Sequence, residues 1–372
     1  MEKALSLIPY KIFPAKLGGQ KGIALFNEYL SKLFPLCCAT VTGNDPRYAT
    51  YPVFNILGDS SLRYINVFNF FRLRKIIRDQ AVTHLILEHP YLGWLGMLLK
   101  KYTGVKLVVH SHNIESTRWK TLGKWWWKIL WWYEGMVHRY ADYNFFIHDE
   151  DRSFAVTEYN VDPAKAITVT YGIEWNQAPS KELRDASREI LLSRYTIESS
   201  AVIMLFNGSL DYSPNLNAVH DILKNINPLF LQGDLVYRII ICGSGLPREM
   251  NDLTSYADKN IIYAGFVDDI SLYFKGSDIF LNPVTEGGGI KTKLVEALGY
   301  GTRAVSTQNG SIGVNPEECG GNLAIVKDKD WEAFASETRR MVSGETSRLP
   351  EGFFKKFYWG NIASKAAEFM RS

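Results

Sequence analysis

Short apolar runs of strand-forming residues alternate with longer amphipathic runs along this chain, and that alternation restricts its fold more than any other feature. A strand followed by a helix and then by another strand gives a parallel sheet that is covered by helices on both faces. We therefore predict an α/β fold class. The predicted strands are residues 4–8, 39–42, 83–87, 106–110, 143–147, 166–170, 202–206, 237–242, 261–264, 279–282 and 304–306. The predicted helices are residues 22–33, 70–79, 92–100, 124–140, 215–225, 272–275 and 294–298.

The alternation restarts once, which predicts two domains. A polar, helix-forming stretch at residues 181–200 precedes a new first strand at residues 202–206. We place the boundary near residue 173 and expect two Rossmann-like domains, residues 1–172 and 173–356, facing each other across a cleft. Ligands of such sheets bind beyond the carboxyl ends of the strands. Functional residues are therefore expected in the loops that follow strands.

Composition excludes several classes of protein. A net charge of +3, without a dense basic stripe, does not indicate a nucleic-acid partner. The four cysteines lack metal-binding spacing and are expected to be buried thiols in a reducing compartment. The N-terminal residues lack the apolar core of a signal peptide. The longest apolar runs, residues 85–99 and 125–137, are shorter than the roughly 20 residues of a membrane-spanning helix. We expect a cytoplasmic protein.

The most informative segment follows the predicted strand that ends at Asn282. Three glycines precede a helix that is predicted to begin near Ile290. Glycines let the backbone approach a ligand closely, and a helix N-terminus offers free N–H groups to an anion. Lysines beside them add positive charge, and a carboxylate one turn later can accept from sugar or ribose hydroxyls. A plain strand–helix turn explains the glycines but not the combination. The predicted phosphate or nucleotide site comprises Gly287, Gly288, Gly289, Ile290, Lys291, Lys293 and Glu296.

Three further loops are weaker candidates. Gly18 and Gly19 follow the first strand without forming a dinucleotide fingerprint, and we interpret them as an acceptor-side or phosphate-side wall. Gly208 lies in a turn after residues 202–206, where a helix cap explains it equally well. His110 and His112 alternate at strand spacing, so they are expected to point to opposite faces. That spacing argues against a shared metal site, and we predict none. One histidine at the strand end, His112, could bind a substrate hydroxyl or could be structural.

Taken in order, these segments resemble a known family. They are Gly-Gly-Gln-Lys-Gly from residue 18, Ser-His-Asn-Ile-Glu from residue 111, Asn-Gly-Ser-Leu-Asp-Tyr-Ser-Pro-Asn from residue 207, Gly-Phe-Val-Asp-Asp from residue 265, and Gly-Gly-Gly-Ile-Lys-Thr-Lys-Leu-Val-Glu-Ala-Leu from residue 287. The ordered set spans nearly the whole chain and resembles the family 4 glycosyltransferases of the GT-B fold.

The resemblance implies retaining transfer of a hexosyl or N-acetylhexosaminyl group from a nucleotide-sugar, without a metal or other cofactor. It implies a glycan or lipid-linked saccharide as the acceptor, in cell-surface polysaccharide biosynthesis. The donor would bind the C-terminal domain, and a last helix within residues 357–372 would cross back to the N-terminal domain. The implied contacts are Glu296 to the ribose, the loop 287–290 and Gly208 to the phosphates and sugar, the backbone of Phe266 and Val267 to the base, and His112 to the transferred sugar.

The chain departs from the family pattern at two places. Many members carry two glutamates seven residues apart, and the first would fall at Gly288. Glu286 lies two residues earlier and is our candidate substitute. The basic residues that many members place after the first strand of the second domain are replaced here by Ser209 and its neighbours. We hypothesise that Lys291 and Lys293 neutralise the diphosphate instead.

Six of the ten tryptophans fall between Trp119 and Trp132, in and before the predicted helix 124–140. At about 100° per residue, one face of this helix is apolar and is expected to be core. That face comprises Trp125, Ile129, Trp132, Tyr133, Met136 and Tyr140. The opposite face carries Lys124, Trp127, Lys128 and Trp131. Tryptophan beside lysine is typical of a membrane-interface or acceptor surface, so peripheral association with the inner face of the cytoplasmic membrane is one expectation. Coverage by a loop or a subunit is the alternative.

Two other functions remain open at this stage. A nucleotide-sugar epimerase of the same fold would turn over the donor without an acceptor. A catalytically inactive scaffold would bind the donor without transferring it, and the glycine at position 288 is the feature that favours this alternative.

Overall fold

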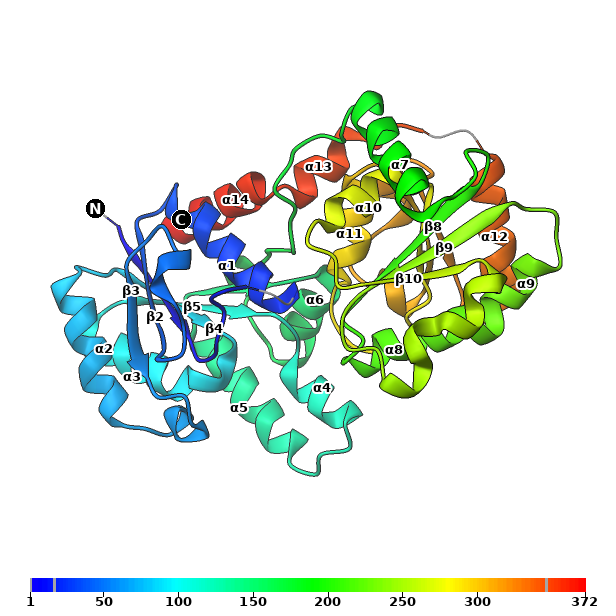
Figure 1. The fold of residues 1–372 in the computed structure, drawn as a ribbon. Helices are drawn as coiled ribbons and strands as arrows, with labels where there is room; N and C mark the ends of the chain where they lie inside the picture. The colour runs from blue at the N-terminus through cyan, green and yellow to red at the C-terminus, as the bar shows by residue number, and fades with distance from the viewer. Residues whose placement is uncertain (1, 16–17, 345–346) are drawn as a thin grey trace. The chain divides into compact units, whose positions relative to one another are not determined.

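The computed structural model describes residues 2–15, 18–344 and 347–372 (Figure 1). The chain divides into two compact units, residues 1–174 with 356–372, and residues 175–355. Each unit contains one parallel sheet with helices packed against it. The predicted fold class, α/β with two Rossmann-like domains, is confirmed.

The first unit contains a seven-stranded sheet of order β3-β2-β1-β4-β5-β6-β7. The chain order reverses beside β1, so the topological switch point lies between β1 and β4. The strands are β1 (Ala4–Ile8), β2 (Leu36–Val41), β3 (Val53–Leu57), β4 (His84–Glu88), β5 (Lys106–Ser111), β6 (Tyr143–Phe146) and β7 (Ala166–Thr168). The helices are α1 (Gly18–Ser31), α2 (Phe68–Asp79), α3 (Gly93–Thr103), α4 (Glu115–Thr121), α5 (Trp127–Tyr140), α6 (Asp149–Glu158) and α14 (Trp359–Arg371).

The C-terminal helix α14 belongs to this first unit, where it packs against α1. The ring of His84 on β4 lies 3.0 Å from the carbonyl oxygen of Met370 near the end of the helix. One face of α14 is buried through Ile362, Ala366 and Met370. This face has the i, i+4 spacing of an amphipathic helix.

The second unit contains a six-stranded sheet of order β10-β9-β8-β11-β12-β13. Its switch point lies between β8 and β11. The strands are β8 (Val202–Asn207), β9 (Tyr237–Cys242), β10 (Ile261–Gly265), β11 (Ile279–Asn282), β12 (Arg303–Thr307) and β13 (Leu323–Val326). The helices are α7 (Lys181–Tyr195), α8 (Ser213–Asp221), α9 (Asn227–Leu231), α10 (Ile270–Gly276), α11 (Thr292–Gly299), α12 (Trp331–Ser343) and α13 (Glu351–Phe357), the last of which leads along the chain into α14.

Two strands were not predicted, and both lie at a sheet edge. β3 contains the polar residue Asn55 and has a half-buried pattern, and β13 is four residues long. A polar residue interrupts the apolar run of β3, and the apolar run of β13 is too short to distinguish a strand from a helix segment by periodicity. The central strands β8, β9 and β11, which are largely apolar, lie close to their predicted positions.

Candidate functional site

In the second unit, the predicted phosphate-binding residues gather at the switch point between β8 and β11. Lys293, in the first turn of α11, points its ammonium at Asn215 of α8, with Nζ 3.2 Å from Oδ1. A Cβ atom built on Gly208, directly after β8, would lie 2.7 Å from Lys293 Nζ and 2.8 Å from Asn215. Only glycine leaves room for this lysine–asparagine pair beside the backbone.

Lys291 contacts the glycine loop itself. Its ammonium donates to the carbonyl oxygens of Gly287 at 2.7 Å and Gly289 at 3.1 Å. These bonds hold the glycine loop in its fold, with φ of 87° at Gly287 and 71° at Gly289. Such positive φ values favour glycine. Lys291 therefore shapes the loop, and Lys293 is the better placed of the two lysines to meet an anion.

Burial makes both ammonium groups less basic. It lowers the pKa of Lys291 and of Lys293 to about 8. For Lys293, the nearby carboxylate of Glu296 acts in the opposite direction and Lys291 adds to the lowering. A desolvated cation of this kind is stabilised by a bound anion. The helix N-terminus of α11, whose first residue is Thr292 rather than the predicted Ile290, adds N–H donors at the same place.

The remaining predicted donor residues lie in α11 and in loops that follow strands of the same sheet. Glu296 is one turn into α11 and half-buried. Glu286 is exposed, and its Oε2 accepts from Asn217 Nδ2 at 3.4 Å. Phe266 is exposed and Val267 is half-buried, directly after β10. Asn215 was not among the predicted site residues, although it is the first residue of the predicted helix 215–225, shortly after the Gly208 turn.

In the first unit, polar side chains gather at the ends of β4 and β5, next to that sheet's switch point. Glu88 is fully buried, and a single oxygen, Oε2, lies 3.0 Å from Nδ1 of His110 and 2.8 Å from Nε2 of His112. The prediction that the two histidines point to opposite faces is wrong. Side chains two residues apart in a strand point to the same face, and His112, directly after the end of β5 at Ser111, keeps that direction, so both rings reach Glu88.

A second histidine–carboxylate pair lies beside the first. Nδ1 of His89 is 3.2 Å from Oε1 of the buried Glu115, and Tyr91 Oη donates to Oε2 of Glu115 at 2.6 Å. The rings of His89 and His112 lie 4.6 Å apart. Both imidazoles keep some surface, 13% exposed at His89 and 15% at His112. Glu115 is distant from Glu88 and His89 along the chain, so the sequence alone did not identify this pair.

Glu88, His110 and His112 are also the described residues whose type and spacing could hold a metal ion. Their potential ligand atoms lie within 4.8 Å of one another. Two histidines and one carboxylate form a donor set that first-row divalent metals accept.

Gly18 and Gly19 form the first turn of α1 rather than a loop before the helix. Gly18 is half-buried and Gly19 is exposed, with open space where a Cβ would lie. Lys16 and Leu17, which directly precede these glycines, lie outside the described residues.

The prediction for the tryptophan-rich helix is wrong about which face is core. Trp125 is 83% exposed, Ile129 63% and Trp132 60%. The buried side chains of α5 include polar ones, Glu134 and His138. Glu134 is buried because its carboxylate accepts hydrogen bonds from the backbone N–H groups of Glu115 and Ser116 at 2.9 Å and so caps α4. These tertiary contacts explain why a polar face of α5, rather than the predicted apolar face, lies inside.

The tryptophans predicted to face outward are instead half-buried. Trp131 packs against Tyr159, with ring centroids 5.6 Å apart. Lys120 and Lys128 lie over the ring of Trp127, at 4.7 Å and 5.8 Å from its centroid. Lys124 and Lys128 are exposed. Lysines therefore border the half-buried Trp127, whereas the exposed tryptophan rings of this segment are those of Trp125 and Trp132.

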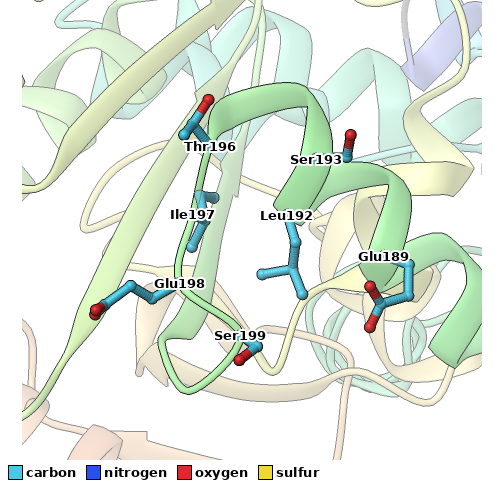
Figure 2. Close-up of a pocket in the computed structure, with 7 residues that line it drawn as sticks. All are labelled: Glu189, Leu192, Ser193, Thr196, Ile197, Glu198 and Ser199. Atoms are coloured by element: carbon cyan, nitrogen blue, oxygen red, sulfur yellow. The ribbon is translucent and has the colours of Figure 1, made fainter.

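A surface pocket of about 500 Å³ lies at the end of α7, lined by residues between Glu189 and Ser199 (Figure 2). These residues precede β8, so the pocket is at the amino end of that strand, and ligands of parallel sheets bind at the carboxyl ends. It brings together no basic or imidazole group. We assign it no role.

Among the described residues, no helix has both the length and the apolarity that a bilayer crossing requires.

Two parallel α/β sheets with glycine-rich and polar loops at their switch points are typical of proteins that bind nucleotides. Comparison with protein families agrees. Residues 34–175 match the model "Glycosyltransferase Family 4", and residues 201–343 match "Glycosyl transferases group 1". Together the two matches cover most of the chain, which belongs to the family 4 type of glycosyltransferases with the GT-B fold.

Individual relatives are distant. The chain is 27% identical to an Escherichia coli UDP-Gal:alpha-D-GlcNAc-diphosphoundecaprenol alpha-1,3-galactosyltransferase, over 69% of this chain and 66% of that protein. It is 24% identical to a chitobiosyldiphosphodolichol beta-mannosyltransferase of Debaryomyces hansenii, over 75% of this chain and 66% of that protein. The alignments thus span slightly less than two thirds of either relative. Among solved structures, HepE of Anabaena in complex with UDP has a TM-score of 0.74 and 12% identity, with both chains covered completely.

Proposed function

We propose that this protein is a glycosyltransferase that moves a hexosyl or N-acetylhexosaminyl group from a nucleotide-sugar to a glycan or lipid-linked saccharide. The observation that carries the proposal is the site around Lys293, Asn215 and Gly208, in a chain of this family. A desolvated ammonium beside a helix N-terminus is the arrangement that a diphosphate requires. The solved structure of HepE with UDP supports a nucleoside diphosphate as the ligand class.

Lys293 and the N–H groups of α11 stabilise the negative charge that grows on the diphosphate as its bond to the anomeric carbon breaks. Gly287, Gly288, Gly289 and Ile290 surround the phosphates and sugar hydroxyls, with Lys291 holding their loop. Glu296 binds the ribose, and the backbone at Phe266 and Val267 contacts the base. Glu286 contacts the donor sugar in place of the glutamate absent at position 288.

The transfer proceeds with retention. The bond from the anomeric carbon to the diphosphate oxygen breaks, a bond from that carbon to the acceptor oxygen forms on the same face, and the acceptor's hydroxyl proton passes to the leaving phosphate. His112 contacts the transferred sugar, while Gly18 and Gly19 are on the acceptor or phosphate side. The step needs positioning and charge stabilisation rather than a metal or other cofactor. The relatives' names leave the stereochemistry open, because one contains an alpha and the other a beta linkage.

The acceptor is a saccharide on a lipid diphosphate, in polysaccharide biosynthesis. Both named relatives support this class, since one name contains diphosphoundecaprenol and the other diphosphodolichol. A lipid acceptor brings the enzyme to the cytoplasmic face of a membrane. The exposed side chains of Leu122, Trp125, Ile129 and Trp132, beside Lys124 and Lys128, provide apolar and basic groups that suit an anionic bilayer surface.

The test has two parts. Thermal-shift measurements against nucleoside diphosphates and nucleotide-sugars, without added metal, should give stabilisation specific to one base. The stabilising donor is then incubated with synthetic lipid-diphosphate saccharides, and NMR determines the anomeric configuration of the product. An alpha linkage from an alpha donor is expected.

Other outcomes would replace the proposal. Epimerisation of the donor without an acceptor would indicate an epimerase. Tight donor binding without any turnover would indicate a scaffold. A beta-linked product from an alpha-linked donor would support the glycosyltransferase activity but contradict the retaining mechanism.

A further inference from the structure

The buried carboxylate of Glu88 makes contacts that fix the ring of His112. Its Oε2 lies 2.8 Å from Nε2 of that ring. Its other oxygen, Oε1, accepts from Ser6 Oγ on β1 at 3.4 Å, and Asn27 of α1 donates to the same serine oxygen at 3.1 Å. Glu88 is therefore anchored from both sides, with no surface exposed.

This arrangement determines which ring nitrogen carries the proton. An ionised carboxylate only accepts hydrogen bonds, so Nε2 of His112 is the protonated nitrogen. Among the described residues, no hydrogen bond to Nδ1 of His112 is present. In the neutral ring Nδ1 is then an acceptor with a free lone pair, and the ring keeps 15% of its surface exposed. A lone pair on a partly exposed ring suits a sugar hydroxyl.

The charge states agree with this arrangement. Burial lowers the pKa of His112, despite the opposing hydrogen bond to Glu88, and so favours the neutral ring at neutral pH. Burial acts to raise the pKa of Glu88, but His110 and His112 outweigh it and hold that pKa well below its usual range.

The backbone beside Glu88 is strained. His89 has φ of 72° and ψ of 153°, a conformation that residues other than glycine rarely adopt. It is held there by its N–H bond to the carbonyl oxygen of His110 at 3.0 Å and by its ring contact with Glu115. Strain of this kind persists where the surroundings over-determine it and is concentrated at functional sites.

We propose that Glu88 is a positioning residue, which locks His112 with Nε2–H toward the carboxylate and Nδ1 toward a hydroxyl of the transferred sugar. This inference rests on the proposed function and assigns a role to a residue that the family resemblance did not mark. A metal ion is the competing explanation for the same side chains. Two ligands on one zinc ion, at about 2.0–2.2 Å each and near tetrahedral angles, lie roughly 3.3 Å or more apart. The 2.8 Å contact is a hydrogen bond instead.

The test is a double-mutant cycle on the full chain. H112A should reduce transfer about 100-fold or more, the usual range for a residue that handles a substrate proton or hydroxyl. E88M, which is similar in length but has no acceptor, should cost about as much. The double variant should be no slower than H112A within about threefold, because Glu88 acts through His112. E88Q still offers an amide oxygen to Nε2–H and should recover much of the activity.

L87A is the matched control, since Leu87 is the fully buried neighbour of Glu88 on β4. Its destabilisation of the strand should lower activity by the same factor in the wild-type and H112A backgrounds. If E88M behaves in this additive way, the positioning role is wrong and Glu88 is only structural.

A spectroscopic measurement keeps the inference testable if E88M fails to fold. ¹⁵N NMR of the imidazoles in the wild-type protein, assigned by comparison with H112A, should show His112 in the Nε2–H form. An Nδ1–H form would overturn the proposal, as would a stoichiometric metal in the purified protein that H112A no longer retains. A wild-type protein that shows no sugar transfer would reject the proposed function, whereas the NMR result would still decide the Glu88–His112 relationship.

Discussion

The ammonium of Lys293 lies 3.2 Å from the amide oxygen of Asn215, and a Cβ on Gly208 would collide with both side chains. Asn215 is held in turn by its Nδ2 bond to the carbonyl oxygen of Ser209 at 2.8 Å. Three chain segments, after β8, in α8 and in α11, thus fix the desolvated ammonium of Lys293 at the switch point of the second sheet.

Removing this cation should weaken binding of a nucleoside diphosphate. A charge-assisted hydrogen bond contributes about 1.5–3 kcal/mol, so K293A should lower affinity about 10- to 100-fold. Isothermal titration calorimetry with the diphosphate found by thermal shift measures the change. K327A, which removes an exposed lysine from the same unit, is the control and should bind as the wild type does. Equal affinity for K293A and the wild type would contradict the assignment.

Diphosphate affinity should also depend on pH. The pKa of Lys293 is about 8 because burial disfavours the charged form. The ammonium is present below that pKa and attracts the anion, so affinity should be greatest below pH 8 and fall as the pH rises through it. Binding measured from pH 6.5 to 9.5 should show a smaller decline for K293Q than for the wild type. The same slope in both proteins would assign the titration to another group.

A single methyl group at position 208 should disturb the site without altering its charge. In G208A the new Cβ would displace Lys293 Nζ and the Asn215 amide. We expect donor affinity to fall about 10-fold or more, as for an ångström-scale misplacement of binding groups. A crystal structure of the variant should show both side chains moved. G233A, on a loop where a Cβ meets nothing closer than 3.8 Å, should bind normally.

Because the backbone at His89 is strained, we expect glycine to be more stable than alanine at this position, the reverse of their usual order in a strand. At φ of 72°, glycine is unstrained and alanine is not. H89G should therefore be more stable than H89A, by about 1 kcal/mol or more, in urea unfolding. At His110, in the regular strand β5, the order should reverse, with alanine the more stable by about 0.5–1 kcal/mol. If H89A matched or exceeded H89G, the backbone there would not be strained.

The exposed apolar side chains around α5 should carry membrane association. The triple variant W125A/I129A/W132A removes large exposed groups that lie beside Lys124 and Lys128. It should lose flotation with vesicles rich in anionic phospholipid, while the wild type floats and is released by high salt. L183A/I190A, which removes exposed apolar residues from α7, should float normally. If the wild-type protein does not bind these vesicles, the proposal that this surface associates with a membrane is wrong.

The α/β alternation and the glycine–lysine segment after β11 could be predicted from the sequence because each is formed by residues that are close together in the chain. Apolar runs predict the central strands. Glycine beside basic residues at a strand end indicates an anion site, and this signal does not depend on residues elsewhere in the chain. The side chains that complete each site come from elsewhere. Asn215 meets Lys293 only because β8 and β11 are neighbours in the sheet, and Glu115 meets His89 across a distance in sequence that periodicity does not reveal.

The tryptophan-rich helix α5 shows that a local pattern can also predict the wrong buried face. Helical periodicity placed Trp125, Ile129 and Trp132 in the core, since apolar residues are buried on average. The structure buries Glu134 and His138 instead, because each finds a hydrogen-bond partner inside the unit, Glu134 at the start of α4 and His138 at Asn144. A buried polar group is tolerated when it is paired, and pairing is a tertiary property.

The sequence by itself therefore determined the fold class and the family, and it located the glycine–lysine loop of the proposed diphosphate site, since each rests on motifs whose own residues are close together in the chain. Only the tertiary structure decided that Lys293 meets Asn215 while Lys291 meets the glycine loop, that Glu88 joins His110 and His112, and that Trp125 faces outward. These outcomes depend on which strand ends become neighbours, and the order of strands in a sheet is fixed by packing between distant segments.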